Sequence, residues 1–382
     1  MDLPKILFDI LKAEVCEENI GAYTLQDDEI DTLLSLAYDH DISYCVIDGL
    51  LKSKCVTENS SFFKSCQNEI NKAMVRSVRF NSTISLAKSL FNKAQIPFMP
   101  LKGAIIKKLY PGELMRSSCD IDILIKEEYF DRAIDLLSQN GFIRSDEKKH
   151  HDVSMYYGKT NLELHFSLIE RMDDIDTLLN KVWDYAVPVS EYEYTQTHEY
   201  FVFHHIAHMK FHFVGGGCGI KPFLDLFIMR RHNFYEEEKL YELLDMAGLR
   251  KFYGSILQVI SVWFEGAPHN ELTLQCQKYI LRGGVYGTVE NQMAVQSSIK
   301  GSRFKNLMRA VFPQSEIMYS LYPILKNHKI LFPFCYLHRI FKKTFGKGSK
   351  TSRSRAGRIL KQESYKINSV KELFDAVGLD EK

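Results

Sequence analysis

The sequence predicts an α+β protein in which a small mixed sheet, within residues 95–170, lies between two helical regions. Three observations predict this class. Residues 120–125 alternate between acids and apolar residues with the period of a strand. Residues 152–157 and 161–166 look like a hairpin with a turn around Gly158. The segments before and after this region carry apolar residues at helical spacing.

Residues 1–94 are predicted to be a helical lead-in. Apolar stripes with a period of three to four residues lie within 6–11, 30–37 and 42–51. A further helix over 77–94 leads into the first strand. The simplest role for this region is to form a scaffold for the sheet.

Residues 95–170 are predicted to form the central α/β unit. An apolar run over 96–101 leads into the turn Lys102-Gly103, and a helix over 104–110 follows. A glycine turn that opens a helix offers backbone N–H groups to an anion. Lys102 adds a positive charge that suits phosphate. After the strand at 120–125, residues 129–139 have helical spacing.

Asp120 and Asp122 project from one face of their strand, about 6–7 Å apart along the chain. Burying an acid is costly unless it is paired or binds a cation. Two acids on one face of an apolar strand therefore indicate a metal such as Mg²⁺. The alternative is a solvated strand end with both acids in water. Glu163 lies on the second strand of the hairpin, from where it could join them.

These motifs resemble the uncharacterised nucleotidyltransferase family of the polymerase-β-like superfamily. The resemblance rests on three segments and covers about residues 85–170. It implies a mixed-sheet nucleotidyltransferase module with helical flanks. The segments are Leu101-Lys102-Gly103, residues 116–124 (RSSCDIDIL) and Leu162-Glu163-Leu164-His165.

The resemblance also implies a set of site residues. Asp120, Asp122 and Glu163 would be the catalytic and metal-binding acids. Lys102, Gly103, Arg116 and Ser117 would contact the nucleotide phosphates. In the family a helix with a basic-x-x-x-Asp pattern follows the catalytic module. We expect this helix to close over the nucleotide, which makes Lys221 and Asp225 candidates. From the residues alone, Arg116 is equally an exposed loop arginine, and Lys221 and Asp225 could pair with each other at i,i+4.

The function expected from these residues is transfer of a nucleoside monophosphate from an NTP, with ATP expected, to an unidentified acceptor hydroxyl. The acids would hold Mg²⁺ or Mn²⁺ ions in a two-metal mechanism. The alternative is a nucleotide-binding scaffold or regulatory protein, for example in a surface-polysaccharide assembly. We further expect repulsion to raise the pKa of at least one of the three acids. Asp122→Asn should then leave stability unchanged or raised.

Residues 171–337 are predicted to be a C-terminal helical domain. A helix over 199–213 places His204, His208 and His212 on one stripe. Such histidines could bind zinc, pack half-buried against a core, or face the active-site cleft. His165 and the pair His150-His151 are other possible ligands. The glycine-rich turn at 215–219 is a weak candidate for a phosphate site.

Residues 338–382 are predicted to be a basic, flexible tail. Nine lysines and arginines fall within 339–361, interrupted by Gly and Ser and without an acid. Such a tail can remain solvated or hold a weak anionic partner such as RNA, lipid headgroups or an acidic protein.

Composition limits the classes of protein to consider. The formal net charge is +1, so no global field attracts nucleic acid. The eight cysteines are scattered, which favours free thiols in a reducing cytoplasm. No apolar run approaches the length of a membrane span, about 20 residues.

Overall fold

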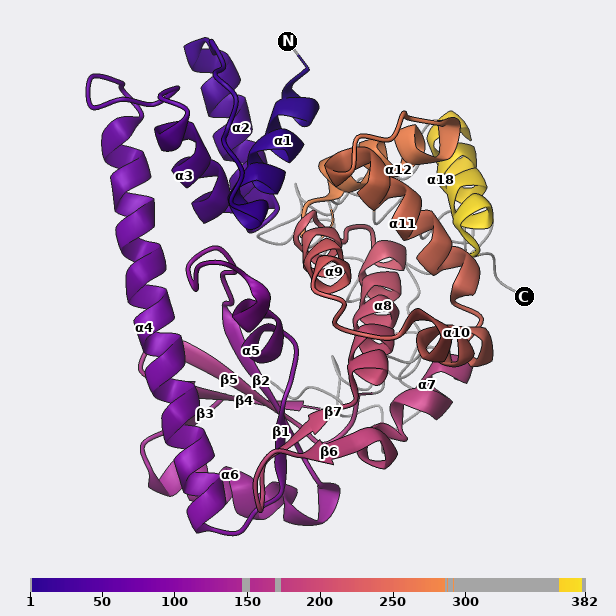
Figure 1. Ribbon diagram of the computed structural model, residues 1–382. Coiled ribbons are helices and arrows are strands. Elements are labelled where there is room, and N and C mark those ends of the chain that lie inside the picture. Colours follow the sequence, from indigo (N-terminus) through magenta and orange to yellow (C-terminus); the bar gives the residue numbers. More distant parts are fainter. Residues whose placement is uncertain are drawn as a thin grey trace, which may run out of the picture.

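The computed structural model describes residues 2–145, 152–168, 173–285, 287, 291 and 364–379. It confirms the predicted α+β class, with a mixed five-stranded sheet and helices before and after it in the chain (Figure 1). The pair His150-His151 and the basic segment 338–363 lie outside the described residues.

The N-terminal region is helical, as predicted. Three helices pack together through buried residues such as Leu7, Leu33 and Val46. A long fourth helix then runs from this group down to the sheet (Figure 1). The helices are α1 (Leu3–Cys16), α2 (Asp27–Asp39), α3 (Ser43–Lys52) and α4 (Phe63–Lys93), so α4 begins earlier than the predicted 77.

The sheet has the strand order β1-β2-β5-β4-β3. β2 pairs with β5 in parallel, and the other neighbours are antiparallel, which makes the sheet mixed. β4 and β5 form the predicted hairpin, whereas the short β3 was not predicted. The bounds are β1 (Phe98–Pro100), β2 (Asp120–Ile125), β3 (Ile143–Arg144), β4 (Asp152–Tyr157) and β5 (Thr160–His165).

The two faces of the sheet differ in chemistry because side chains alternate along each strand. Ile121, Ile123 and Leu164 are buried with residues of α4 and of α6 (Phe130–Gln139). These two helices therefore cover the apolar face. The other face carries the acids of β2 and β5. A short helix, α5 (Gly103–Ile106), continues as a 3₁₀ turn and lies between β1 and β2 in the chain.

A second, two-stranded sheet extends the edge of the first. β6 (Ala186–Pro188) pairs with β7 (Tyr194–Gln196), and the Phe98 amide donates to the Tyr192 carbonyl at 2.9 Å. This hairpin was not predicted. Before this hairpin, the region predicted to be helical from residue 171 onward contains α7 (Asp173–Leu179) and a 3₁₀ turn at 182–185.

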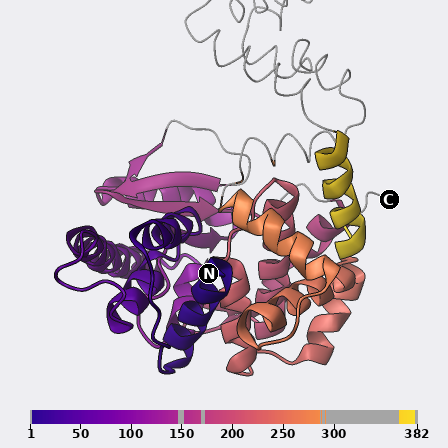
Figure 2. The ribbon, with the colours of Figure 1, turned by 90° about the horizontal axis from the view of Figure 1, so that it is seen from above.

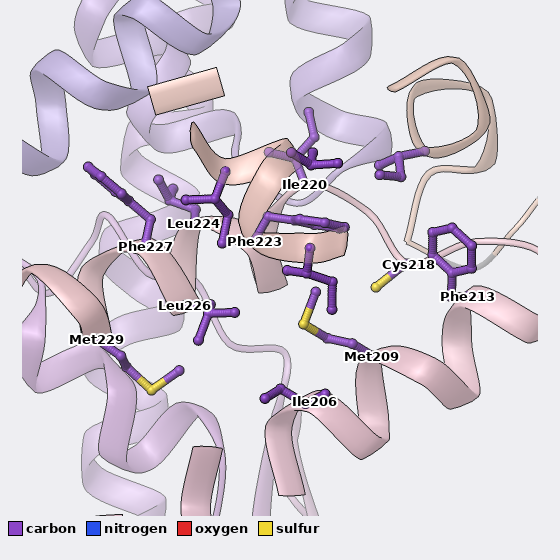
Figure 3. Close-up of a cluster of buried hydrophobic side chains, with 14 of the residues drawn as sticks. Ile206, Met209, Phe213, Cys218, Ile220, Phe223, Leu224, Leu226, Phe227 and Met229 are labelled. Carbon is purple, nitrogen blue, oxygen red and sulfur yellow. The ribbon is translucent and has the colours of Figure 1, made fainter. Parts of the chain in front are cut away.

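The C-terminal region is also helical. Apolar residues of two of its helices, α8 (His198–Val214) and α9 (Lys221–Arg231), pack together (Figure 3). Seen from above, the helices of the C-terminal region lie beside the N-terminal helices (Figure 2). The helices are α8 (His198–Val214), α9 (Lys221–Arg231), α10 (Glu237–Met246), α11 (Arg250–Phe264), α12 (Glu271–Gly283) and α18 (Ser364–Val377).

Helix α18 differs from the flexible end expected for the last part of the chain. It packs on α11 and α12, and Leu373, Phe374 and Val377 are buried. The ring of Phe374 lies 5.8 Å from that of Phe213, which buries aromatic surface that a solvated tail would expose.

Two other expectations concern the molecule as a whole. Among the described helices, none combines the length and the hydropathy that crossing a membrane requires. The cysteines that the structure describes are free thiols, as predicted; these are Cys16, Cys45, Cys55, Cys66, Cys119, Cys218 and Cys276.

Candidate active site

The parallel pairing of β2 and β5 brings acids from two distant segments together. Asp122 lies opposite Glu163 in the register, and His165 follows two residues later on the same face. The carboxylate oxygens of Asp122 and Glu163 and an imidazole nitrogen of His165 all lie within 4.8 Å of one another. The expected placement of Glu163 beside the Asp strand is therefore confirmed. Oxygen and nitrogen atoms at this spacing fit a divalent cation.

Asp120 is not a member of this group, although it faces the same cavity. Its register partner is Asn161, whose amide nitrogen donates to Asp120 Oδ1 at 3.0 Å and to Glu163 Oε1 at 3.3 Å. Asn161 therefore links Asp120 to the group. The converging ligand atoms are thus those of Asp122, Glu163 and His165, and Asp120, the other acid of the predicted set, lies beside them in the same cavity.

Asp122 is held as a carboxylate by two neighbours. Its Oδ1 atom lies 3.2 Å from Lys102 Nζ and 3.0 Å from His165 Nε2. Burial alone would raise the pKa of Asp122, but the charge of Lys102 and the hydrogen bond from His165 outweigh it. The pKa of Asp122 is therefore well below its usual value. Of the three acids, at least one of which was expected to have a raised pKa, Asp122 shows the opposite shift, because Lys102 and the hydrogen bond from His165 stabilise its charged form.

The turn at Lys102-Gly103 is tightly built. Lys102 has φ 44° and ψ −115°, a conformation that favours glycine. At Gly103 a Cβ atom would lie 2.3 Å from Ser118 Oγ and 3.0 Å from Arg116 Nη1, so any other residue would require these side chains to shift. The loop that contains Arg116 therefore packs directly on the turn.

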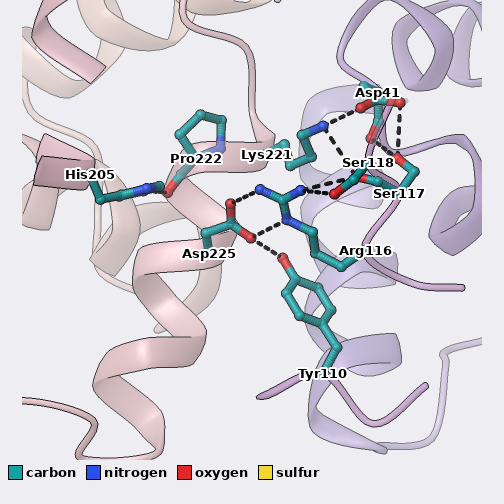
Figure 4. Close-up of polar contacts among 9 residues, drawn as sticks. All are labelled: Asp41, Tyr110, Arg116, Ser117, Ser118, His205, Lys221, Pro222 and Asp225. Atoms are coloured by element: carbon teal, nitrogen blue, oxygen red, sulfur yellow. Dashed lines mark hydrogen bonds and ion pairs between the residues drawn. The ribbon is translucent and has the colours of Figure 1, made fainter. Parts of the chain in front are cut away.

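Arg116 forms a buried ion pair with Asp225 (Figure 4). The guanidinium Nε and Nη2 atoms donate to the two carboxylate oxygens at 3.1 and 2.9 Å. The Tyr110 hydroxyl donates to Asp225 Oδ1 at 2.7 Å. Burial opposes the charge of Asp225, yet Arg116 lowers the pKa of that carboxyl below its usual value. Arg116 is thus not an exposed loop arginine, and Asp225 does not pair with Lys221.

Lys221 instead forms an ion pair with Asp41, which follows α2 (Figure 4). The Ser117 hydroxyl donates to Asp41 Oδ1 at 2.9 Å. The two ion pairs, Arg116–Asp225 and Lys221–Asp41, are here called the polar bridge. The polar bridge joins the N-terminal helices, the sheet unit and α9, which are far apart in the sequence.

A cavity of about 510 Å³ lies over the polar face of the sheet. Its walls come from the sheet, the Lys102-Gly103 turn and helices α8 and α9, which is typical of a ligand site. Of the residues predicted from the sequence, Lys102, Gly103, Arg116, Asp120, Asp122, Glu163, Lys221 and Asp225 line it. Ser117 instead binds Asp41.

Helix α8 contributes four histidines to this cavity, three of them from the predicted stripe. His208 and His212 contact each other through their Nε2 atoms at 3.0 Å, and His205 Nε2 contacts the Pro222 carbonyl at 2.9 Å. Burial and the charge of Lys102 lower the pKa of His208 well below its usual value. The described residues hold no group of three or more ligands that includes these histidines, so the cleft-facing interpretation is favoured over zinc.

The glycine-rich turn after α8 does not leave room for a phosphate at Gly217. A Cβ atom there would lie 2.3 Å from the Gly287 nitrogen and 2.8 Å from the Gly284 carbonyl. The backbone of the segment after α12 therefore closes on this turn. The absence of a side chain at Gly217 therefore allows the two backbones to approach each other closely.

Several residues of the site were not identified from the sequence, among them Asp41, Tyr110 and Asn161. The side chain of each forms a hydrogen bond or an ion pair with a residue at least 41 positions away in the sequence. Only Asn161 had a local signal, since it shares the polar face of its strand with Glu163 and His165. Asp41 and Tyr110 lie in a loop and at the end of a 3₁₀ turn, where no periodicity marks them.

The fold and the cavity define a class of protein. Acids on adjacent strands can hold a divalent cation, and a lysine at a glycine turn beside them can hold phosphate. This combination in one cavity is typical of enzymes that act on a metal-bound phosphate compound.

Comparison with known families identifies the group within this class. The sequence model of the uncharacterised nucleotidyltransferase family matches residues 26–265, which is more than half of the 382-residue chain. The chain belongs to this family, and its membership supports a nucleotidyl-transfer function. A search of the curated proteins found no significant match, and neither did a search of the solved structures.

Proposed function

We propose that the protein transfers a nucleoside monophosphate from an NTP, with ATP expected, to a hydroxyl group of an acceptor. The observation that carries this proposal is the in-register pair of Asp122 and Glu163, which faces the cavity beside Lys102. We also expect the protein to act in the cytoplasm, where NTPs are abundant and its thiols stay reduced.

Asp122 and Glu163, with Asp120 next to them, would hold Mg²⁺ or Mn²⁺. The ions would supply charge stabilisation for the triphosphate and for the attacking oxygen in a two-metal mechanism. The residues present fit this role because carboxylate oxygens from two strands converge on one point. Lys102 is already within 3.2 Å of Asp122, so its ammonium is placed at the edge of this centre.

In the proposed reaction, the acceptor oxygen forms a bond to the α-phosphorus of the NTP. The bond between the α-phosphorus and the bridging oxygen to the β-phosphorus breaks, and pyrophosphate leaves with that electron pair. Glu163 would take the proton of the acceptor hydroxyl; if it instead helps to hold an ion, solvent water would take that proton. Lys102 and the Gly103 amide bind the departing pyrophosphate.

Arg116 and Asp225 have a different role in this proposal from the direct phosphate contact expected from the sequence. Their side chains bind each other, and Arg116 packs on Gly103. We therefore assign them to positioning the phosphate-binding turn. Lys221 and Ser117 support the same loop through Asp41.

The test is a pyrophosphate-release assay with each NTP, Mg²⁺ or Mn²⁺, and a mixture of small hydroxyl acceptors. The wild-type protein should release pyrophosphate, and Glu163→Gln should reduce the rate by at least a hundredfold. Glu128→Gln, the same change at an exposed position, is the matched control and should keep the wild-type rate. If the protein binds an NTP but releases no pyrophosphate, it is a nucleotide-binding scaffold instead.

A further inference from the structure

The group of converging ligands contains an imidazole where the resemblance implied a third carboxylate. His165 Nε2 lies 3.0 Å from Asp122 Oδ1 and 3.9 Å from Glu163 Oε2. Asp120, the residue expected in this place, instead contacts Asn161. The difference in ligand type bears on which cation the site prefers.

The spacing of the three atoms suits one ion. Ligands at about 2.1 Å from an octahedral ion lie about 3.0 Å from their neighbours and about 4.2 Å from the opposite ligand. The separations to His165 Nε2 fall within this range, so small side-chain movements would bring all three atoms onto one ion.

The position of His165 is fixed by the fold. Its strand, β5, lies between β2 and β4, and both ladders include this residue. The side chain is only 6% exposed and faces the cavity. The imidazole is therefore presented at a defined point by two sets of backbone hydrogen bonds rather than by a mobile loop.

The other imidazoles of the cavity are less suited to this role. His208 and His212 contact each other at 3.0 Å, but the described residues provide no third ligand within reach of that pair. His205 contacts the Pro222 carbonyl and His204 contacts Gln196. His165 is thus the imidazole that shares its position with two acids.

We propose that Asp122, Glu163 and His165 bind one divalent first-row transition-metal ion, such as Mn²⁺ or Co²⁺, in preference to Mg²⁺. Imidazole nitrogen is a good ligand for these ions, whereas Mg²⁺ prefers oxygen ligands and water. This ion is one of the two that would serve the proposed nucleotidyl transfer, so its catalytic meaning rests on that proposal. Its binding, however, can be measured without turnover.

The test uses the full-length protein, freed of metal by a chelator, and titrates it with Mn²⁺ while the signal of free Mn²⁺ is followed by electron paramagnetic resonance. Mg²⁺ is then added as competitor. The wild-type protein should bind Mn²⁺ at least tenfold more tightly than Mg²⁺. His165→Gln should weaken Mn²⁺ binding by about ten- to a hundredfold and change Mg²⁺ binding much less.

His212→Gln is the matched control, since it removes an imidazole of the same cavity that is not in the group. It should bind Mn²⁺ as the wild type does. Pulsed electron paramagnetic resonance should show coupling of Mn²⁺ to an imidazole nitrogen in the wild type and in His212→Gln, and none in His165→Gln. Coupling that survives in His165→Gln but disappears in His212→Gln would overturn the assignment.

A second variant keeps the proposal testable if His165→Gln fails to fold. His165→Asp replaces the nitrogen ligand by an oxygen ligand, so it should retain Mg²⁺ binding while the preference for Mn²⁺ falls. An equal affinity of the wild type for Mn²⁺ and Mg²⁺ would refute the proposal. A protein with the expected metal preference that releases no pyrophosphate would refute only the proposed reaction.

Discussion

Lys102 shows how a single residue can combine a structural cost with a role in the site. Its backbone has φ 44° and ψ −115°, where side chains other than glycine are strained. Its ammonium lies 3.2 Å from Asp122, and its turn borders the cavity. A position that favours glycine but carries lysine is consistent with selection for the charge. The cost and the benefit can be separated by two substitutions.

Lys102→Ala and Lys102→Gly both remove the charge, but only glycine also removes the strain. Both should weaken nucleotide binding by about ten- to a hundredfold, because one charge-assisted contact is lost. Lys102→Gly should be more stable than Lys102→Ala by about 1 kcal/mol, since strain relief exceeds the added entropy of the unfolded chain. Calorimetric nucleotide titration and urea unfolding measure the two effects. Equal stability of Lys102→Ala and Lys102→Gly would show that the backbone at position 102 is not strained.

Asp122→Asn tests the residue that both ions would share. Pyrophosphate release should fall by at least a hundredfold, because the charge that holds the metal is gone. Stability should also fall, by about 1–3 kcal/mol at pH 7, because Lys102 and His165 lose their charged partner. This replaces the expectation from the sequence that stability would be unchanged or raised.

The pH dependence of this loss follows from the lowered pKa of Asp122. The stabilisation by the carboxylate is fully present above the unfolded-state pKa of about 3.9 and is lost as the pH falls below it. The stability difference between wild type and Asp122→Asn should therefore be constant from pH 5 to 8 and shrink below about pH 4. Unfolding of the metal-free proteins by urea across this range measures it.

At the scale of elements, helices α1 and α3 contact each other through an ion pair with unequal partners. Glu14 of α1 has a fully buried side chain, whereas Lys52 of α3 is about half exposed, with Nζ 2.8 Å from the carboxylate. Burial raises the pKa of Glu14 to about 7 despite Lys52. This helix pair therefore carries a pH-sensitive contact between residues that do not line the cavity.

Glu14→Gln should make the stability less dependent on pH. In the wild type the folded state holds a proton that the unfolded state releases above about pH 4.3, so stability falls as the pH rises from there to about 7. Between pH 4.5 and pH 8, the stability of the variant relative to that of the wild type should rise by about 3 kcal/mol. Asp9→Asn, at a partly exposed position on the same helix, is the control and should keep the pH dependence of the wild type. Urea unfolding at several pH values measures both.

At the scale of the whole molecule, the polar bridge connects three parts of the chain that are separated in the sequence. Asp41 follows the N-terminal helices, Arg116 precedes β2, and Lys221 and Asp225 belong to α9. The Arg116–Asp225 pair is 9% and 1% exposed, whereas Lys221 and Asp41 are 17% and 23% exposed. The buried pair should therefore contribute more to holding α9 against the sheet unit.

Asp225→Asn and Asp41→Asn make the same chemical change in the two pairs. Asp225→Asn should cost about 3–5 kcal/mol, because it leaves the guanidinium of Arg116 buried without its counter-charge. Asp41→Asn should cost about 1 kcal/mol or less, because Lys221 can reach water. Thermal or urea unfolding of both variants tests this. Similar losses in both would show that burial does not decide the strength of the polar bridge.

The sequence by itself determined the local elements and which side chains share a face. Alternation in residues 120–125 and 161–165 depends only on neighbours two positions apart, so it revealed β2, β5 and the facing of Asp122 and Glu163. Helical spacing likewise revealed most of the helices that flank the sheet. The family motif placed Lys102, Gly103 and the acids, and each of these lines the cavity.

Only the tertiary structure decided which of these side chains meet. The register of β2 against β5 sets Asp122 opposite Glu163 and Asp120 opposite Asn161, and so brings in His165. Arg116 and Asp225 meet across 109 positions, and Lys221 and Asp41 across 180. Strand register and helix packing are set by the burial of apolar surface over the whole chain. Local periodicity carries no information about partners so distant, because it reflects only the geometry of one element.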